Sequence, residues 1–136
     1  MKWLSGILLF FLLLMQSACE EIFFYNCADC LESEPVEGTL YINVSGYNQF
    51  TTYEITVYQG KVEDNIIIAE LTSNTNVEIQ VQLNKEYSVK VISTFNGIEY
   101  IAVSSATPRV KFSEDYCEIP CYFIRDNEIN ARIKYH

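Results

Sequence analysis

The chain has 136 residues, enough for one domain, and carries 18 Asp and Glu against 9 Lys and Arg, a formal net charge of −9. Nucleic acids and anionic lipid headgroups attract cationic proteins, so this charge argues against direct binding to either. The chain also has five cysteines, and an odd number cannot all pair within one chain.

The first 18 residues have the layout of a secretory signal peptide. Lys2 supplies a positive charge, residues 7–15 form an unbroken apolar core, and Ser17 and Ala18 are small residues ahead of a cut. A membrane span is the alternative, but the apolar stretch of residues 4–15 falls short of the roughly 20 residues that a spanning helix needs. We therefore expect a signal-peptide helix at residues 1–18.

Cys19 follows the small residues directly. Ser17, Ala18 and Cys19 resemble the lipobox of bacterial lipoproteins, although Gln16 stands where a Leu is usual. The resemblance implies cleavage before Cys19, a diacylglycerol on its thiol and an acylated amino terminus. The alternatives are a free thiol or a disulfide to another chain. We expect lipidation, because a leftover thiol in an exported protein is reactive.

Removal of residues 1–18 would leave a mature chain of 118 residues with 8 Lys and Arg against 18 Asp and Glu, a net charge of −10. Such a surface does not attract anionic membranes, so the tether to the membrane has to be covalent. Residues 19–37 then form a lipid-anchored, cysteine-containing linker ahead of one domain at residues 38–136.

Four cysteines stand in two pairs, Cys27 with Cys30 and Cys117 with Cys121. An exported chain meets an oxidising compartment, so we expect two disulfides, with bridges between the clusters favoured among three connectivities. A four-thiolate zinc site is the alternative. The second pair has C-x3-C spacing and 86 residues separate the pairs, much longer than zinc-ribbon spacing, so we expect no metal.

Apolar and polar residues alternate along the rest of the chain, which is typical of antiparallel strands with one buried face. The alternating runs are residues 40–44, 53–58, 77–83, 87–91 and, as the last strand, 130–135. Residues 66–71 and 98–103 are more apolar and suit central strands. Asn96-Gly97 predicts a two-residue hairpin turn, Asn84-Lys85 a second tight turn, and Pro108 an edge or strand end.

Seven or eight short strands in about 100 residues indicate an all-β fold, an antiparallel β-sandwich of immunoglobulin or transthyretin type. No run after the signal has a helical period.

Residues that could carry catalysis are scarce. The single histidine is the terminal His136, and no G-x-S-x-G motif or glycine-rich phosphate loop occurs. The acidic pairs Glu63–Asp64 and Glu114–Asp115 lack a calcium-loop pattern and suit solvated turns. We expect no enzyme activity and no cofactor.

Tyr41 and Tyr58 fall on the predicted outer faces of the first two strands. Tyrosine is favoured at binding surfaces, so these residues form a candidate binding face for a protein or glycan. Cross-strand packing on the sheet is the equally consistent alternative.

The mature chain resembles small β-sandwich lipoproteins that are abundant in Bacteroidota. The likeness rests on "CADCLESEP", "GTLYINV", "ITVYQGKVEDN", "LNKEYSVKV", "CEIPCY" and "ARIKY", spread over residues 19–136. It implies export to the outer membrane or cell surface, since an acidic stretch after the lipid-bearing Cys marks surface display and Glu20 and Glu21 are similar. The apolar "IFFY" that follows departs from that pattern and leaves a periplasm-facing location open.

The sequence therefore predicts a lipid-anchored cell-envelope protein that acts as a non-enzymatic binding or scaffolding module. The alternatives are a structural subunit that assembles through its sheet edges and, less favoured, a secreted enzyme or metal-binding protein.

Overall fold

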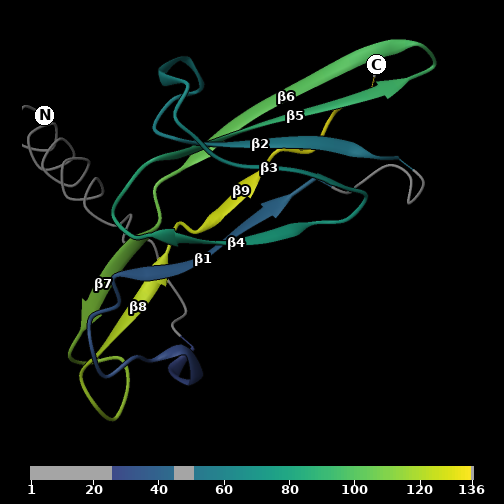
Figure 1. Ribbon diagram of the computed structural model, residues 1–136. Coiled ribbons are helices and arrows are strands. Elements are labelled where there is room, and N and C mark those ends of the chain that lie inside the picture. Colours follow the sequence, from purple (N-terminus) through teal and green to yellow (C-terminus); the bar gives the residue numbers. More distant parts are fainter. Residues whose placement is uncertain (1–25, 45–50, 136) are drawn as a thin grey trace, which may run out of the picture.

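The computed structural model describes residues 26–44 and 51–135, which form two sheets and a two-stranded ribbon (Figure 1). The strands are β1 (Glu37–Asn43), β2 (Tyr53–Gln59), β3 (Ile67–Ser73), β4 (Val77–Gln82), β5 (Tyr87–Phe95), β6 (Ile98–Ala106), β7 (Arg109–Ser113), β8 (Cys121–Arg125) and β9 (Glu128–Asn130). Two 3-10 turns, η1 (Cys27–Asp29) and η2 (Val62–Asp64), are the only helical elements among these residues. None of the helical segments there is long and apolar enough to cross a membrane.

The sandwich consists of a three-stranded sheet, β4-β1-β9, and a four-stranded sheet, β3-β2-β5-β6. Leu40 and Ile42 of one sheet join Ile55, Val57 and the inner residues of β5 in a single buried core, so the all-β sandwich is confirmed. Among the described strands, β1 pairs with β9 in parallel and the other pairs are antiparallel. Residues 44–127 supply the long crossover connection that a parallel pair of strands requires.

The predicted alternation determines the inner face of most strands. Val77, Ile79 and Val81 of β4 pack toward the core while Glu78 and Gln80 are exposed. Asn96 and Gly97 both have positive φ, 50° and 75°, and join β5 to β6 in the predicted hairpin. The turn at Asn84 also exists, with φ 62°, but it leads from one sheet to the other, because β4 and β5 do not pair.

The prediction of central strands at residues 66–71 and 98–103 is wrong, because β3 and β6 are the two edges of the four-stranded sheet. Their apolar side chains include exposed ones, such as Ile67, Ile101 and Val103. An apolar run indicates a strand, but it does not distinguish a covered outer face from an exposed one.

The ribbon β7–β8 was not predicted and projects from one end of the sandwich (Figure 1). The last strand also differs from the prediction, since β9 ends at Asn130. Ala131 still donates its backbone N–H to the Asn43 carbonyl at 2.9 Å, and Ala131 and Ile133 pack inward. Tyr135 packs against the rings of Phe95 and Tyr100 in tilted and edge-on geometry. Pro108 is buried at the boundary between β6 and β7, as expected for a residue that cannot donate to a ladder. Residues 1–18 and Cys19 lie outside the described residues.

Candidate functional site

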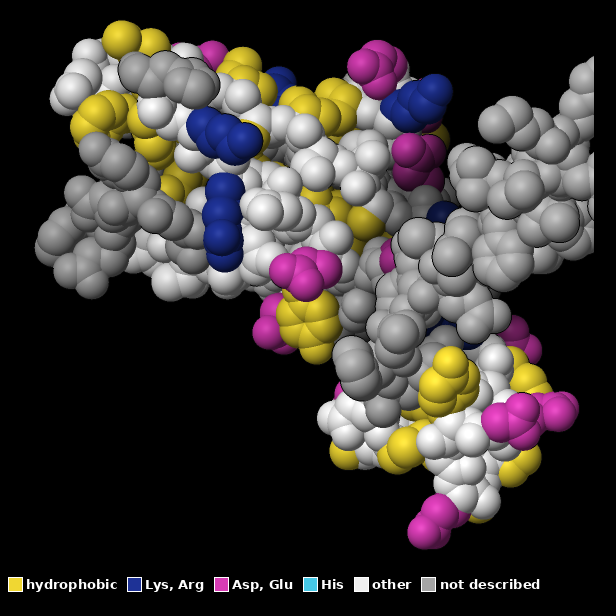
Figure 2. Space-filling view, turned by 180° about the vertical axis from the view of Figure 1, so that it is seen from behind, with side chains coloured by type: hydrophobic (Ala, Val, Ile, Leu, Met, Phe, Trp, Pro, Cys, Tyr) yellow, Lys and Arg dark blue, Asp and Glu magenta, His cyan; other side chains and the backbone are white. Residues whose placement is uncertain are grey.

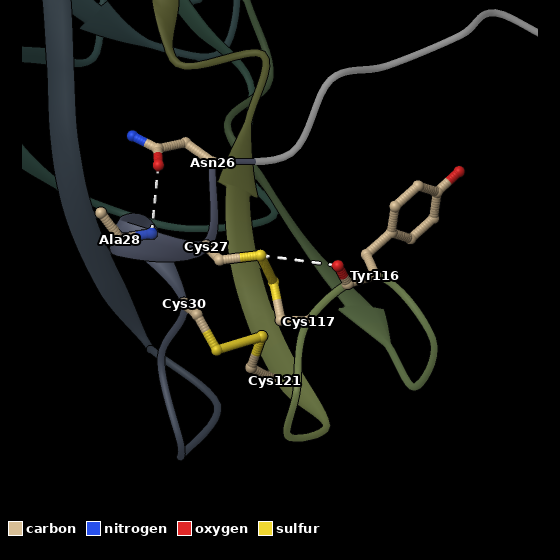
Figure 3. Close-up of a disulfide and its surroundings, with 7 residues drawn as sticks. All are labelled: Asn26, Cys27, Ala28, Cys30, Tyr116, Cys117 and Cys121. Carbon is tan, nitrogen blue, oxygen red and sulfur yellow. Dashed lines mark hydrogen bonds between the residues drawn. A yellow bond between two sulfur atoms is a disulfide. The ribbon is translucent and has the colours of Figure 1, made fainter.

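Two disulfides fasten the N-terminal segment to the far end of the chain (Figure 3). Cys27 is bonded to Cys117 and Cys30 to Cys121, with Cα–Cα distances of 5.8 and 5.5 Å. These distances are typical of disulfides, and the connectivity is the predicted bridging between clusters. Residues 26–31 are therefore part of the folded domain, although the sequence placed them in a linker.

Local hydrogen bonds support this arrangement. The Asn26 side chain accepts from the Ala28 backbone N–H at 3.1 Å and so begins the turn η1 (Figure 3). Leu31 and Tyr122 exchange two backbone hydrogen bonds of 3.0 and 2.9 Å, which add one bridge to the edge of β8. The Cys27 sulfur also lies 3.5 Å from the Tyr116 carbonyl oxygen. A disulfide sulfur carries no hydrogen, so this is a van der Waals contact.

The sulfurs of Cys30, Cys117 and Cys121 lie within 4.8 Å of one another, a spacing that would also suit a metal ion. Each of the three sulfurs belongs to a disulfide, whereas a zinc ligand is a thiolate. The cluster thus follows from the adjacency of two disulfides.

Beside this disulfide-bonded end lies a hollow of about 620 Å³, within the usual range for small-molecule pockets. It forms where the segment 26–31, the strands β1 and β8, and the β8–β9 connection meet. Its apolar lining is Ala28, Leu31, Phe123 and Ile124. Its polar lining is Asn26, Asp29, Thr39, Tyr41, Arg125 and Asn127.

Asn127 holds two walls of the hollow together. Its side-chain amide donates to the Thr39 carbonyl at 2.8 Å, and its backbone carbonyl accepts from the Tyr41 N–H at 2.9 Å. Phe123, only 4 % exposed, packs beneath. The hollow is therefore built from segments that covalent bonds and backbone hydrogen bonds already hold in place, which favours a preorganised site.

Tyr41 lies at the border between this hollow and the outer face of the three-stranded sheet, and it is 43 % exposed. Its neighbours in register are Glu78 of β4 and Glu128 of β9. The placement of Tyr41 on an accessible face agrees with the sequence prediction.

The prediction that Tyr58 shares this face is wrong. Tyr58 is only 6 % exposed and belongs to β2, in the other sheet. It does point outward from the core, but the ladder is irregular after Val57, and the turn η2 packs on β2 and β5 at this place. Ser88, its partner in register, is also buried and donates to the Gly60 carbonyl at 2.7 Å. The connection from β2 to β3 thus covers Tyr58.

The acidic pairs lie in turns. Glu63 and Asp64 belong to η2, where the Asp64 carboxylate accepts from the Lys61 N–H at 3.0 Å. Glu114 and Asp115 are exposed in the loop between β7 and β8. His136 is outside the described residues.

Comparison of the chain with family models, with curated proteins and with solved structures finds no match. The sequence did not predict the hollow. Asn127, Phe123 and Arg125 belong to no motif, and the single sequence signal near them is the neighbouring Cys121.

Proposed function

We propose that the chain is a lipid-anchored cell-envelope protein that acts as a non-enzymatic binding or scaffolding module. The observation that carries the proposal is the pair of disulfides at the N-terminal end of the domain. Disulfides persist outside the reducing cytoplasm, which supports export, and export agrees with the signal-peptide layout of residues 1–18.

The position of the disulfides also suits a tether at Cys19. Asn26, where the described structure begins, is seven residues after Cys19, a span of at most about 25 Å. The disulfide-bonded end of the domain would then stay close to the membrane, with the β5–β6 hairpin far from it. In Figure 2 this projecting end carries several acidic side chains. Its exposed carboxylates are Asp29, Glu32, Glu34, Glu114, Asp115 and Glu118.

Such an acidic end is repelled by anionic headgroups, so a covalent lipid is the tether that fits this surface. Glu20 and Glu21 after the anchor favour display at the cell surface over a periplasm-facing location. Protease treatment of intact cells distinguishes the two, because it degrades the surface-displayed domain and spares one that faces the periplasm.

The proposal that the chain is not an enzyme rests on the scarcity of residues that could act as a general acid or base. General acid–base catalysis near neutral pH needs a group poised to titrate there, and His136 is the only histidine. No serine or cysteine thiol among the described residues stands beside such a base.

The test of the anchor is cell fractionation of a Cys19→Ala variant. The parent is expected in the membrane fraction with the mass of a lipid-modified chain, and the variant is expected to leave that fraction. A matched control is the Cys27→Ala/Cys117→Ala variant, which loses one disulfide and should stay with the membrane. Retention of the Cys19→Ala variant in the membrane would overturn the proposal.

A second candidate function is assembly through the edges of the four-stranded sheet, favoured by the apolar edge strands. Ile101 and Val103 of β6 are 55 % and 58 % exposed, and within residues 26–44 and 51–135 no strand pairs with the edge of β6 that faces away from β5. An unpaired edge is a template for strand addition.

Sedimentation of the purified chain tests this assembly. An assembling parent should sediment as oligomers, and Ile101→Lys/Val103→Lys should sediment as a monomer. The control is Ser105→Lys, which adds charge to the same strand and removes no apolar side chain. A parent that stays monomeric at every concentration excludes edge assembly.

A further inference from the structure

We infer that the hollow between residues 26–31, the strands β1 and β8, and the β8–β9 connection is a binding site for a neutral saccharide of one or two rings. The inference names the ligand class for the binding role and so rests on the proposed function. It starts from the hollow itself, whose volume of about 620 Å³ suits a small ligand.

Charge is the first criterion. The hollow has one acidic residue, Asp29, and one basic residue, Arg125, so its formal charges cancel, although the whole chain is strongly acidic. A phosphorylated or carboxylated ligand would be attracted by a surplus of cationic groups, which is missing here. The balanced pair fits an uncharged ligand.

The second criterion is the mixture of aromatic and polar groups. A sugar ring presents C–H bonds on its faces and hydroxyl groups around its edge. The half-exposed ring of Tyr41 offers a flat apolar surface for one face, while Asp29, Asn26 and Asn127 offer acceptors and amide donors for hydroxyls. An aliphatic or sterol ligand would need a predominantly apolar lining, but six of the ten lining residues are polar.

The third criterion is availability of these groups. Among the described residues no hydrogen bond occupies the Tyr41 hydroxyl or the Asp29 carboxylate. The Asn26 amide uses its oxygen to accept from Ala28, which leaves its NH₂ group for a ligand. Hydroxyl-rich ligands bind weakly when the site has to order itself, and here the walls are held by two disulfides and the hydrogen bonds of Asn127.

A cationic ligand is the rival, since Glu78 and Glu128 flank Tyr41 on the sheet face and a cation over a tyrosine ring is attracted to it. Neither glutamate lines the hollow. A lysine-rich peptide would therefore bind on the open sheet and not in the hollow, and the experiment includes it as a separate probe.

The experiment uses the full-length chain, purified from membranes in a detergent without a sugar headgroup. The probes are immobilised glucose, galactose, mannose, N-acetylglucosamine and their disaccharides, with sialyllactose and a lysine-rich peptide alongside. We expect at least one neutral saccharide to be retained. Tyr41→Ser should weaken that binding by about tenfold, because stacking area is lost, and Tyr41→Phe should change it by less than about threefold.

Asp29→Asn should also weaken binding, because the carboxylate is a stronger acceptor for hydroxyl groups than an amide oxygen. The control is Tyr116→Ser, an exposed tyrosine at the same end of the domain that does not line the hollow. An unchanged unfolding midpoint shows that each variant is folded. The inference is overturned if no neutral saccharide binds, if Tyr41→Ser binds like the parent, or if only the peptide or sialyllactose is retained. The saccharide-binding results do not depend on whether the chain is found in the membrane fraction. A failure of the saccharide inference can therefore be distinguished from a failure of the proposed lipid anchor.

Discussion

Gly38 of β1 and Ile124 of β8 approach so closely that a Cβ on Gly38 would stand 2.8 Å from Cδ1 of Ile124. Cδ2 of Leu83 would be 3.1 Å away. The sandwich and the β7–β8 ribbon therefore meet at a position where an added Cβ would require the Ile124 side chain to shift.

Gly38→Ala is expected to destabilise the domain by roughly 1–3 kcal/mol, because Ile124 and Leu83 have to shift. In an Ile124→Val background, which lacks Cδ1, the same change should cost less. Denaturant unfolding of the parent, Gly38→Ala, Ile124→Val and the double variant gives the coupling energy between the two positions. Strictly additive effects would show that the Gly38–Ile124 contact does not limit the packing.

The two disulfides should stabilise the domain non-additively. They close nearly the same loop, with sequence separations of 90 and 91 residues, so either one alone constrains the unfolded chain. Loss of both should cost about 4–5 kcal/mol, and loss of one much less. The measurement is urea unfolding of Cys27→Ala/Cys117→Ala, Cys30→Ala/Cys121→Ala and the quadruple variant. The model would be contradicted if the losses of unfolding free energy in the two double variants were equal and added up to the loss in the quadruple variant.

The same disulfides should differ in their rate of reduction. Cys27 is exposed, whereas Cys121 is completely buried, and thiol–disulfide exchange requires access to a sulfur atom. With limiting reductant, the Cys27–Cys117 bond should open first. Alkylation followed by peptide mass analysis identifies the first thiols, and early labelling of Cys121 would refute the order.

Truncation of Tyr58 should destabilise the domain much more than truncation of Tyr41. Tyr58→Ala removes a buried ring under the η2 turn and should cost about 3 kcal/mol or more. Tyr41→Ala removes a half-exposed ring and should cost less than about 1 kcal/mol. Thermal unfolding of the two variants measures this, and similar losses would mean that η2 does not cover Tyr58 in solution.

Two buried tyrosines should make the fold sensitive to alkali. Burial raises the pKa of Tyr53, with repulsion from Tyr135 adding to it. Burial also raises the pKa of Tyr87, whose O–H donates to the Gln82 carbonyl. Because the folded state keeps these phenols protonated, their contribution is fully present below the unfolded pKa of about 10 and declines as the pH rises through the folded pKa.

The unfolding free energy should therefore fall above about pH 10, and Tyr53→Phe/Tyr87→Phe should flatten that decline. Tyr116→Phe is the matched exposed control. Measurements of unfolding between about pH 8 and pH 11 check this, and an unchanged slope in the double variant would assign the decline to other groups.

The sequence by itself determined the features that depend on neighbours along the chain. Alternation in Val77–Leu83 identified a strand and its buried face, and Asn96-Gly97 identified a hairpin, because both signals reside in a few consecutive residues. The paired spacing of the cysteines favoured bridges between the clusters, which the structure confirms.

Only the tertiary structure decided which strands are neighbours and what covers their outer faces. Residues 66–71 and 98–103 became edges and Tyr58 became buried, because sheet order and the path of the β2–β3 connection depend on packing between distant segments. The hollow is the clearest case. Asn26, Tyr41 and Asn127 meet there only because two disulfides and a parallel β1–β9 pairing bring both ends of the domain together. Periodicity records whether a side chain is buried, but it carries no information about the distant residue that buries it.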